Sequence, residues 1–80
     1  MREMDYADFY DLAEYCNENW RGKFSHRETA INAYIYKVEY DAKGTESEVI
    51  KSLLEQLRED GSDEAVEWMG RITNESAESN

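Results

Sequence analysis

Apolar residues recur at helical spacing in four segments of the chain. The apolar stripe of the first segment, about residues 5–19, consists of Phe9, Leu12, Ala13, Cys16 and Trp20. The polar positions of this segment are Asp8, Asp11, Tyr15 and Glu18, with Glu14 close by. This spacing predicts an amphipathic α-helix. Asp5 and Asp8 fall in its first turn, where negative charge suits the helix dipole. Gly22 interrupts the pattern and predicts a turn.

The second segment begins with a helix start signal but carries a composition that also suits a strand. Ser25 and Glu28 have capping-box spacing, which predicts a helix from His26. Its apolar stripe would be Ala30, Ile31, Tyr34, Ile35, Val38 and Ala42. The run AYIYKVEY, residues 33–40, is rich in β-branched and aromatic residues, which favour strands. We favour a helix because Gly44 stands where a C-terminal cap belongs and no partner strand is evident. The strand alternative stays open at this point.

The third and fourth segments carry the same kinds of helix start and stop signals. Thr45 and Glu48 have capping-box spacing, and Gly61 follows the last apolar position. The apolar stripe between them is Val49, Ile50, Leu53, Leu54 and Leu57. Ser62 then predicts the N-cap of a fourth helix. Its apolar face would be Ala65, Val66, Met69 and Ile72, with Trp68 beside it.

These segments predict an all-α protein, a compact bundle of about four short helices. We expect residues 1–73 to form a single helical domain. The acidic segment NESAESN, residues 74–80, predicts a disordered tail. Whether Trp20 and Trp68 belong to the core or to a contact surface is left open by the pattern.

Size and composition fit a small soluble domain. The chain has 80 residues, of which 40% are hydrophobic, and no apolar run approaches the ~18 residues needed to span a bilayer. The N-terminal residues MREMDYADFY lack the apolar stretch of a signal peptide. The single cysteine, Cys16, cannot form an internal disulfide. We therefore expect a cytoplasmic protein.

Charge is the strongest compositional indication of function. Nineteen acids against nine bases give a net charge of −10. Such a charge repels nucleic-acid phosphates and anionic lipids, so we expect no direct binding of nucleic acid or membrane. The complementary partner is a basic protein surface. Solubility alone also favours an acidic surface.

The residues offer no evident catalytic or metal-binding set. His26 and Cys16 are single copies, so no zinc set can form, and neither a calcium loop nor a glycine-rich phosphate loop occurs. A Cys16–His26 dyad is conceivable across the turn, but nothing supplies an oxyanion hole. Paired carboxylates such as Glu55 and Glu59 could in principle act in acid–base catalysis, but such pairs arise by chance in a helix with many acids. We expect no enzymatic activity, no metal and no cofactor.

Tyrosines interleaved with acids point instead to protein binding. A tyrosine beside a carboxylate suits an Arg/Lys-rich surface, because its ring stacks under a guanidinium. The alternative is that the tyrosines wrap the edge of a small core. Tyr36 and Tyr40 from the second helix are predicted contact residues. The predicted contact residues of a first face are Asp8, Tyr10, Asp11, Glu14, Tyr15 and Glu18. Those of a second face are Glu55, Glu59, Asp63, Glu64 and Glu67.

A short, acidic, tyrosine-rich, proline-free helical chain resembles the small proteins that phages and mobile elements use against host defence. The resemblance is to anti-CRISPR and anti-restriction proteins of the DNA-mimic kind, and it rests on size and composition over the whole chain. It implies a stoichiometric inhibitor that docks acidic faces onto the basic nucleic-acid-binding surface of a partner enzyme. No family-specific motif is present, so the resemblance assigns no residue roles.

One stretch of the chain departs from the acidic composition. The stretch NENWRGKFSHRE, residues 17–28, is basic, which favours one or two acidic faces over acidity throughout. We interpret that stretch as a junction between two helices. The alternative function is a small regulatory or adaptor module, antitoxin-like, acting by self-association or by apolar docking onto a partner helix. Monomer and homodimer both remain open.

Overall fold

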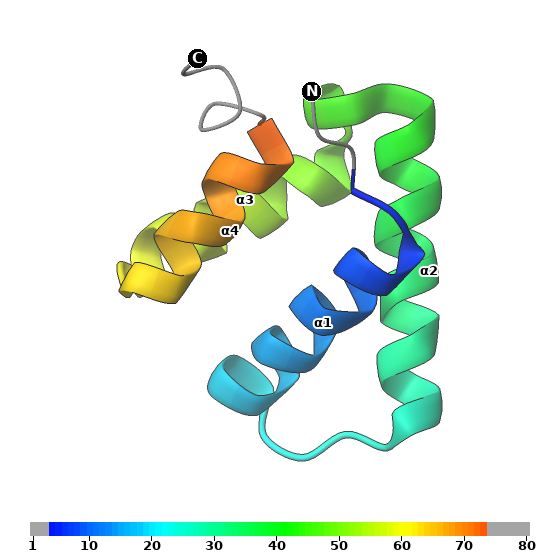
Figure 1. Ribbon diagram of the computed structural model, residues 1–80, viewed down its shortest axis with the longest axis vertical. Helices are drawn as coiled ribbons and strands as arrows, with labels where there is room; N and C mark the ends of the chain where they lie inside the picture. The colour runs from blue at the N-terminus through cyan, green and yellow to red at the C-terminus, as the bar shows by residue number, and fades with distance from the viewer. Residues whose placement is uncertain (1–3, 74–80) are drawn as a thin grey trace. The chain divides into compact units, whose positions relative to one another are not determined.

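A computed structural model describes residues 4–73, and over this range the fold is all-α (Figure 1). The helices are α1 (Tyr6–Cys16), α2 (His26–Lys43), α3 (Glu48–Asp60) and α4 (Asp63–Thr73). A π-helical segment, Asn17–Arg21, continues α1, and a 3-10 turn, Gly44–Glu46, follows α2. No strand occurs within residues 4–73, so the run 33–40 is helical. The predicted all-α class is confirmed, and the predicted tail, residues 74–80, lies outside the described residues.

The predicted limits of α2 are confirmed by its local hydrogen bonds. The Glu28 backbone N–H donates to Ser25 Oγ at 3.1 Å, and the Ser25 N–H donates to Glu28 Oε1 at 3.0 Å. This reciprocal pair satisfies two N–H groups at the helix start, so α2 begins at His26. The helix ends at Lys43, and Gly44 follows with φ of 60°, a conformation that glycine adopts without strain.

The predicted capping box at the start of α3 is wrong. Thr45 lies in the 3-10 turn, and the N-cap is Ser47, two residues later. Ser47 has extended backbone angles, and its Oγ accepts from the N–H groups of Val49 at 3.1 Å and Ile50 at 3.3 Å. The short turn after α2 postpones the first extended residue, and a cap requires that conformation. Gly61 ends α3 in the left-handed region, and Ser62 Oγ accepts from the Ala65 N–H, both as predicted.

The helical stretch that begins with α1 continues through the π-helical segment to Arg21, past the predicted limit of about residue 19. Asp5 is its N-cap and forms a reciprocal capping box with Asp8. At the other end, the backbone widens into the π-helical segment and stops at Gly22, whose φ is 102°. π-helical turns inside or after α-helices are rare and concentrate at functional sites.

The chain divides into two compact units, each with its own set of buried apolar side chains. The unit Met4–Val38 contains α1, the π-helical segment and most of α2. Its buried apolar residues are Met4, Phe9, Leu12, Ala13, Tyr15, Cys16 and Ala33. In residues 39–73, α3 and α4 pack against each other. The buried apolar residues there are Ile50, Leu53, Leu57, Ala65, Trp68 and Ile72. None of the helices in residues 4–73 is long and apolar enough to cross a membrane.

Candidate binding surfaces

The outward face of α2 carries large apolar side chains from the predicted apolar stripe of this helix. The exposed fractions are 50% for Ile31, 62% for Tyr34, 43% for Ile35 and 44% for Val38. We call these four residues the α2 stripe. Their spacing places them on one helical face, as predicted. In the structure this apolar face is exposed and is not part of the buried core.

The opposite face of α2 is the one that packs inward. Thr29 and Ala33 are buried, and Tyr36 and Tyr40 are half-buried. These four positions also recur at helical spacing, half a turn away from the α2 stripe. Thr29 and Ala33 are small, so another backbone can approach closely there. The Thr29 hydroxyl accepts a 3.0 Å hydrogen bond from the Asn17 side-chain amide.

Tyr36 and Tyr40, both predicted as contact residues, are engaged within the chain. The Tyr36 ring lies 6.3 Å from the Phe9 ring. Burial raises the Tyr36 pKa to about 12, and the nearby Cys16 thiol adds to this effect while Arg21 opposes it. The Tyr40 hydroxyl donates to the Ile72 carbonyl at 2.6 Å. These two tyrosines therefore wrap the core, which is the alternative that the sequence pattern left open.

The tyrosines of the first predicted face differ in exposure. Tyr15 is buried, at 9% exposed, and its ring meets the Trp20 ring edge-on at 6.2 Å. Its predicted place on the polar side of the helix is therefore wrong. Tyr10 is half-buried, and its hydroxyl lies 3.2 Å from His26 Nδ1. Trp20 is half-buried, whereas Trp68 is buried and carries Arg71 over its ring at 4.4 Å.

The carboxylates of the first predicted face do not act as one group. Asp8 is used in the capping box of α1. Asp11 and Glu18 are exposed, and Glu14 is half-buried. Glu14 and Glu18 line a hollow, described below, that does not include Asp11.

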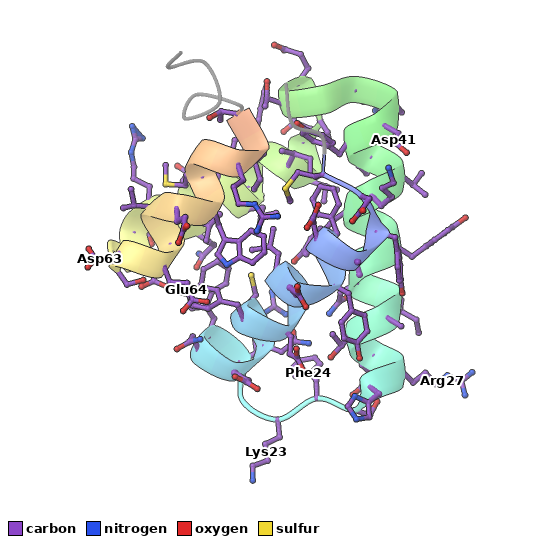
Figure 2. All side chains as sticks on the ribbon, viewed as in Figure 1. Lys23, Phe24, Arg27, Asp41, Asp63 and Glu64 are labelled. Carbon is purple, nitrogen blue, oxygen red and sulfur yellow. The ribbon has the colours of Figure 1, made fainter. Side chains whose placement is uncertain are left out.

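The second predicted face keeps all its carboxylates at the surface. The exposed residues Glu55, Glu59, Asp63, Glu64 and Glu67, which we call the acidic set, come from α3 and α4. Figure 2 labels Asp63 and Glu64 at the start of α4. Residues 39–73 contain ten acids against four bases, whereas residues 4–38 contain six against four. Most of the negative charge therefore belongs to the second unit.

A hollow of about 530 Å³ lies beside the π-helical segment, within the unit Met4–Val38. Its lining includes Glu14, Asn17 and Glu18 from the first helical stretch, and Lys23, Phe24 and His26 from the following loop and the start of α2. The sequence pattern predicted a junction at this stretch. The structure adds that the junction encloses a concave surface.

Metal and nucleophile chemistry find little support in residues 4–73. Among these residues, no group of three or more His, Cys, Asp or Glu side chains is arranged to hold a metal ion. Cys16 is a buried free thiol, whereas His26 is exposed and contacts Tyr10. This placement gives the conceivable Cys16–His26 dyad no geometric support.

These observations define a small all-α protein with an exposed apolar helix face, an acidic second unit and a hollow with a mixed polar and apolar lining. No known protein family, curated protein or solved structure matches this chain.

Proposed function

We propose that the protein is a non-enzymatic binding module that self-associates through the α2 stripe. The exposure of Ile31, Tyr34, Ile35 and Val38 on one helix face carries this proposal. Scattered apolar residues on a surface need no explanation, but a contiguous row of large ones is typical of a protein-binding site. A small regulatory or adaptor module is the function class that such a surface supports.

The occupant we propose is a second copy of the chain, with the two α2 helices antiparallel. α2 is one uninterrupted helix, so the order of residues along its outward face is fixed. In an antiparallel pair, Ile31 meets the second copy's Val38, and Tyr34 meets the second copy's Ile35. The stripe is thus complementary to itself, which a two-fold interface requires.

Charges at the two ends of the stripe favour the same orientation. Arg27 lies one turn before Ile31, and Asp41 lies close to one turn after Val38. Figure 2 shows Arg27 and Asp41 near opposite ends of α2. Antiparallel pairing brings Arg27 of each copy towards the other copy's Asp41, whereas parallel pairing would place like charges together.

The experiment combines cross-linking with a charge swap. Tyr34 is replaced by photoreactive benzoylphenylalanine, and the matched control carries it at Gln56, which is exposed on α3. The purified protein should give a dimeric product from position 34 and not from position 56. Sedimentation should show that Arg27→Asp and Asp41→Arg each weaken the dimer, and that the double variant restores it. A chain that stays monomeric at high concentration, with no product from position 34, would contradict the proposal.

A second candidate function follows from the acidic set and matches the DNA-mimic class. In this function, the carboxylates of α3 and α4 dock onto the basic nucleic-acid-binding surface of a partner enzyme and inhibit it stoichiometrically. The observation that favours it is the excess of ten acids over four bases in residues 39–73, with the whole acidic set exposed. Complementary charge accelerates and orients such docking.

Competition with DNA tests this second function. Proteins captured on the immobilised chain from nuclease-treated lysate should be released by short duplex DNA, because both would occupy one site. Capture should also weaken with salt. The variant Glu59→Gln/Glu67→Gln should lose capture, whereas Asp11→Asn/Glu18→Gln, with the same change in charge, should retain it. Capture that survives both DNA and the first variant would exclude the acidic set as the contact surface.

A further inference from the structure

We propose that the hollow beside the π-helical segment binds a guanidinium group, such as that of arginine. This site uses neither the α2 stripe nor the acidic set, so it stands independently of the functions proposed above. Its volume of about 530 Å³ is within the range of small-molecule pockets. Its lining contains carboxylate and amide acceptors that have no donor partner among residues 4–73.

Two carboxylates supply the charge. Glu14 and Glu18 are four residues apart and both line the hollow. Within the part of the chain that the structure describes, neither carboxylate makes a hydrogen bond or an ion pair. Two adjacent negative charges repel each other, so a bound cation relieves that repulsion.

A buried amide oxygen provides the second, independent observation. Asn17 is 4% exposed, and it lines the same hollow. The Thr29 hydroxyl donates its hydrogen to the Ser25 carbonyl at 3.1 Å, so towards Asn17 it can only accept. This fixes the Asn17 amide with its nitrogen on Thr29. Asn17 Oδ1 is then left without a partner among residues 4–73, and a buried acceptor of this kind calls for a donor.

An aromatic side chain in the lining favours a planar cation. Phe24, 36% exposed, lines the hollow, and Figure 2 shows it directed towards α1 while Lys23 points away into solvent. A guanidinium is flat and carries five N–H donors, so it can bond carboxylates and an amide oxygen while stacking on a phenyl ring. An ammonium has fewer donors and no flat face. The hollow therefore discriminates between arginine and lysine chemistry.

Amide chemical shifts measured by NMR during titration provide the test. The probes are L-argininamide, a short blocked peptide with one arginine, L-lysinamide, and L-citrullinamide, which keeps the α-amine but has a neutral side chain. We expect saturable millimolar binding of the arginine probes that shifts the amides of residues 17–26. Tighter binding of the peptide would identify the source as a protein side chain, and tighter binding of argininamide would identify a small molecule.

Variants separate a specific site from a general effect of charge. Glu18→Gln should weaken binding of argininamide about threefold or more, whereas Asp11→Asn, an equal charge change on an exposed carboxylate of α1 outside the hollow, should leave it unchanged. The proposal is overturned by equal losses in Glu18→Gln and Asp11→Asn, by equal affinity for lysinamide, or by the absence of saturation.

Discussion

Truncating Ile35 to alanine should barely change the stability of the isolated chain, whereas the same truncation of Leu57 should be severe. Leu57 is 0% exposed, and removing a fully buried leucine side chain costs about 3–5 kcal/mol. Ile35 is 43% exposed, so only about half of its roughly 2 kcal/mol burial term is at stake. Alanine returns about 0.4 kcal/mol through its higher helix propensity. The net loss for Ile35→Ala is therefore about 0.5–1 kcal/mol.

Urea denaturation followed by far-ultraviolet circular dichroism measures both losses. At low micromolar concentration, where self-association is small, Ile35→Ala should lie close to the wild type and Leu57→Ala far below it. At high concentration, the wild type should gain stability from dimerisation and Ile35→Ala should gain less. A loss for Ile35→Ala as large as that for Leu57→Ala at low concentration would show that the α2 stripe packs inside the monomer.

Three further predictions concern single groups. Tyr36 should ionise near pH 12, which the absorbance of tyrosinate detects. Because its folded pKa is raised from 10.0, the free energy of unfolding should fall between pH 10 and 12, and Tyr36→Phe should remove this part of the decline. Ser47→Ala should lower the free energy of unfolding by about 1–2 kcal/mol through loss of the α3 cap, whereas Ser52→Ala, exposed within the same helix, should be nearly neutral. Gly61→Ala should cost about 1 kcal/mol because φ is 70°, and thermal melts that show no loss would contradict the cap geometry.

Several helix starts and ends were predictable from the sequence, because caps and turns depend on a few neighbouring residues. Ser25 with Glu28, Gly61 and Ser62 all act where their side chains or backbone freedom indicate. The error at Thr45 has the same origin. Two start signals lie close together, and the choice of Ser47 depends on a 3-10 turn that the capping pattern does not encode.

The packing face of α2 was not predictable from hydrophobicity. Periodicity identifies residues that share a face, but α2 has two such rows, and the more apolar row is the exposed one. The inward row combines the small residues Thr29 and Ala33 with Tyr36, whose ring lies beside Phe9, and Tyr40, whose hydroxyl donates to the Ile72 carbonyl. Helical spacing and small side chains were the signals for the inward row. The greater hydrophobicity of the α2 stripe outweighed them in the prediction.

The candidate hollow could be predicted only in part. Glu14 and Glu18 were predicted contact residues, and both belong to the lining of the hollow. Asn17 was missed, because its burial depends on the π-helical widening and on the hydrogen bond to Thr29. Spacing predicts neither feature. The acidic set was easier, since charged residues on the polar side of regular helices face water.

The exposure of the α2 stripe limits the free energy that the proposed dimer can gain. Each of the four stripe residues is about half exposed, so burying the remainder gives about 1 kcal/mol per side chain, or about 8 kcal/mol for both copies. Association costs about 4–15 kcal/mol in lost freedom, so these contacts alone give at best a weak complex. The end charges on Arg27 and Asp41 add orientation more than affinity. We therefore expect the proposed dimer to form only when the chain is abundant, and to exchange readily with the monomer.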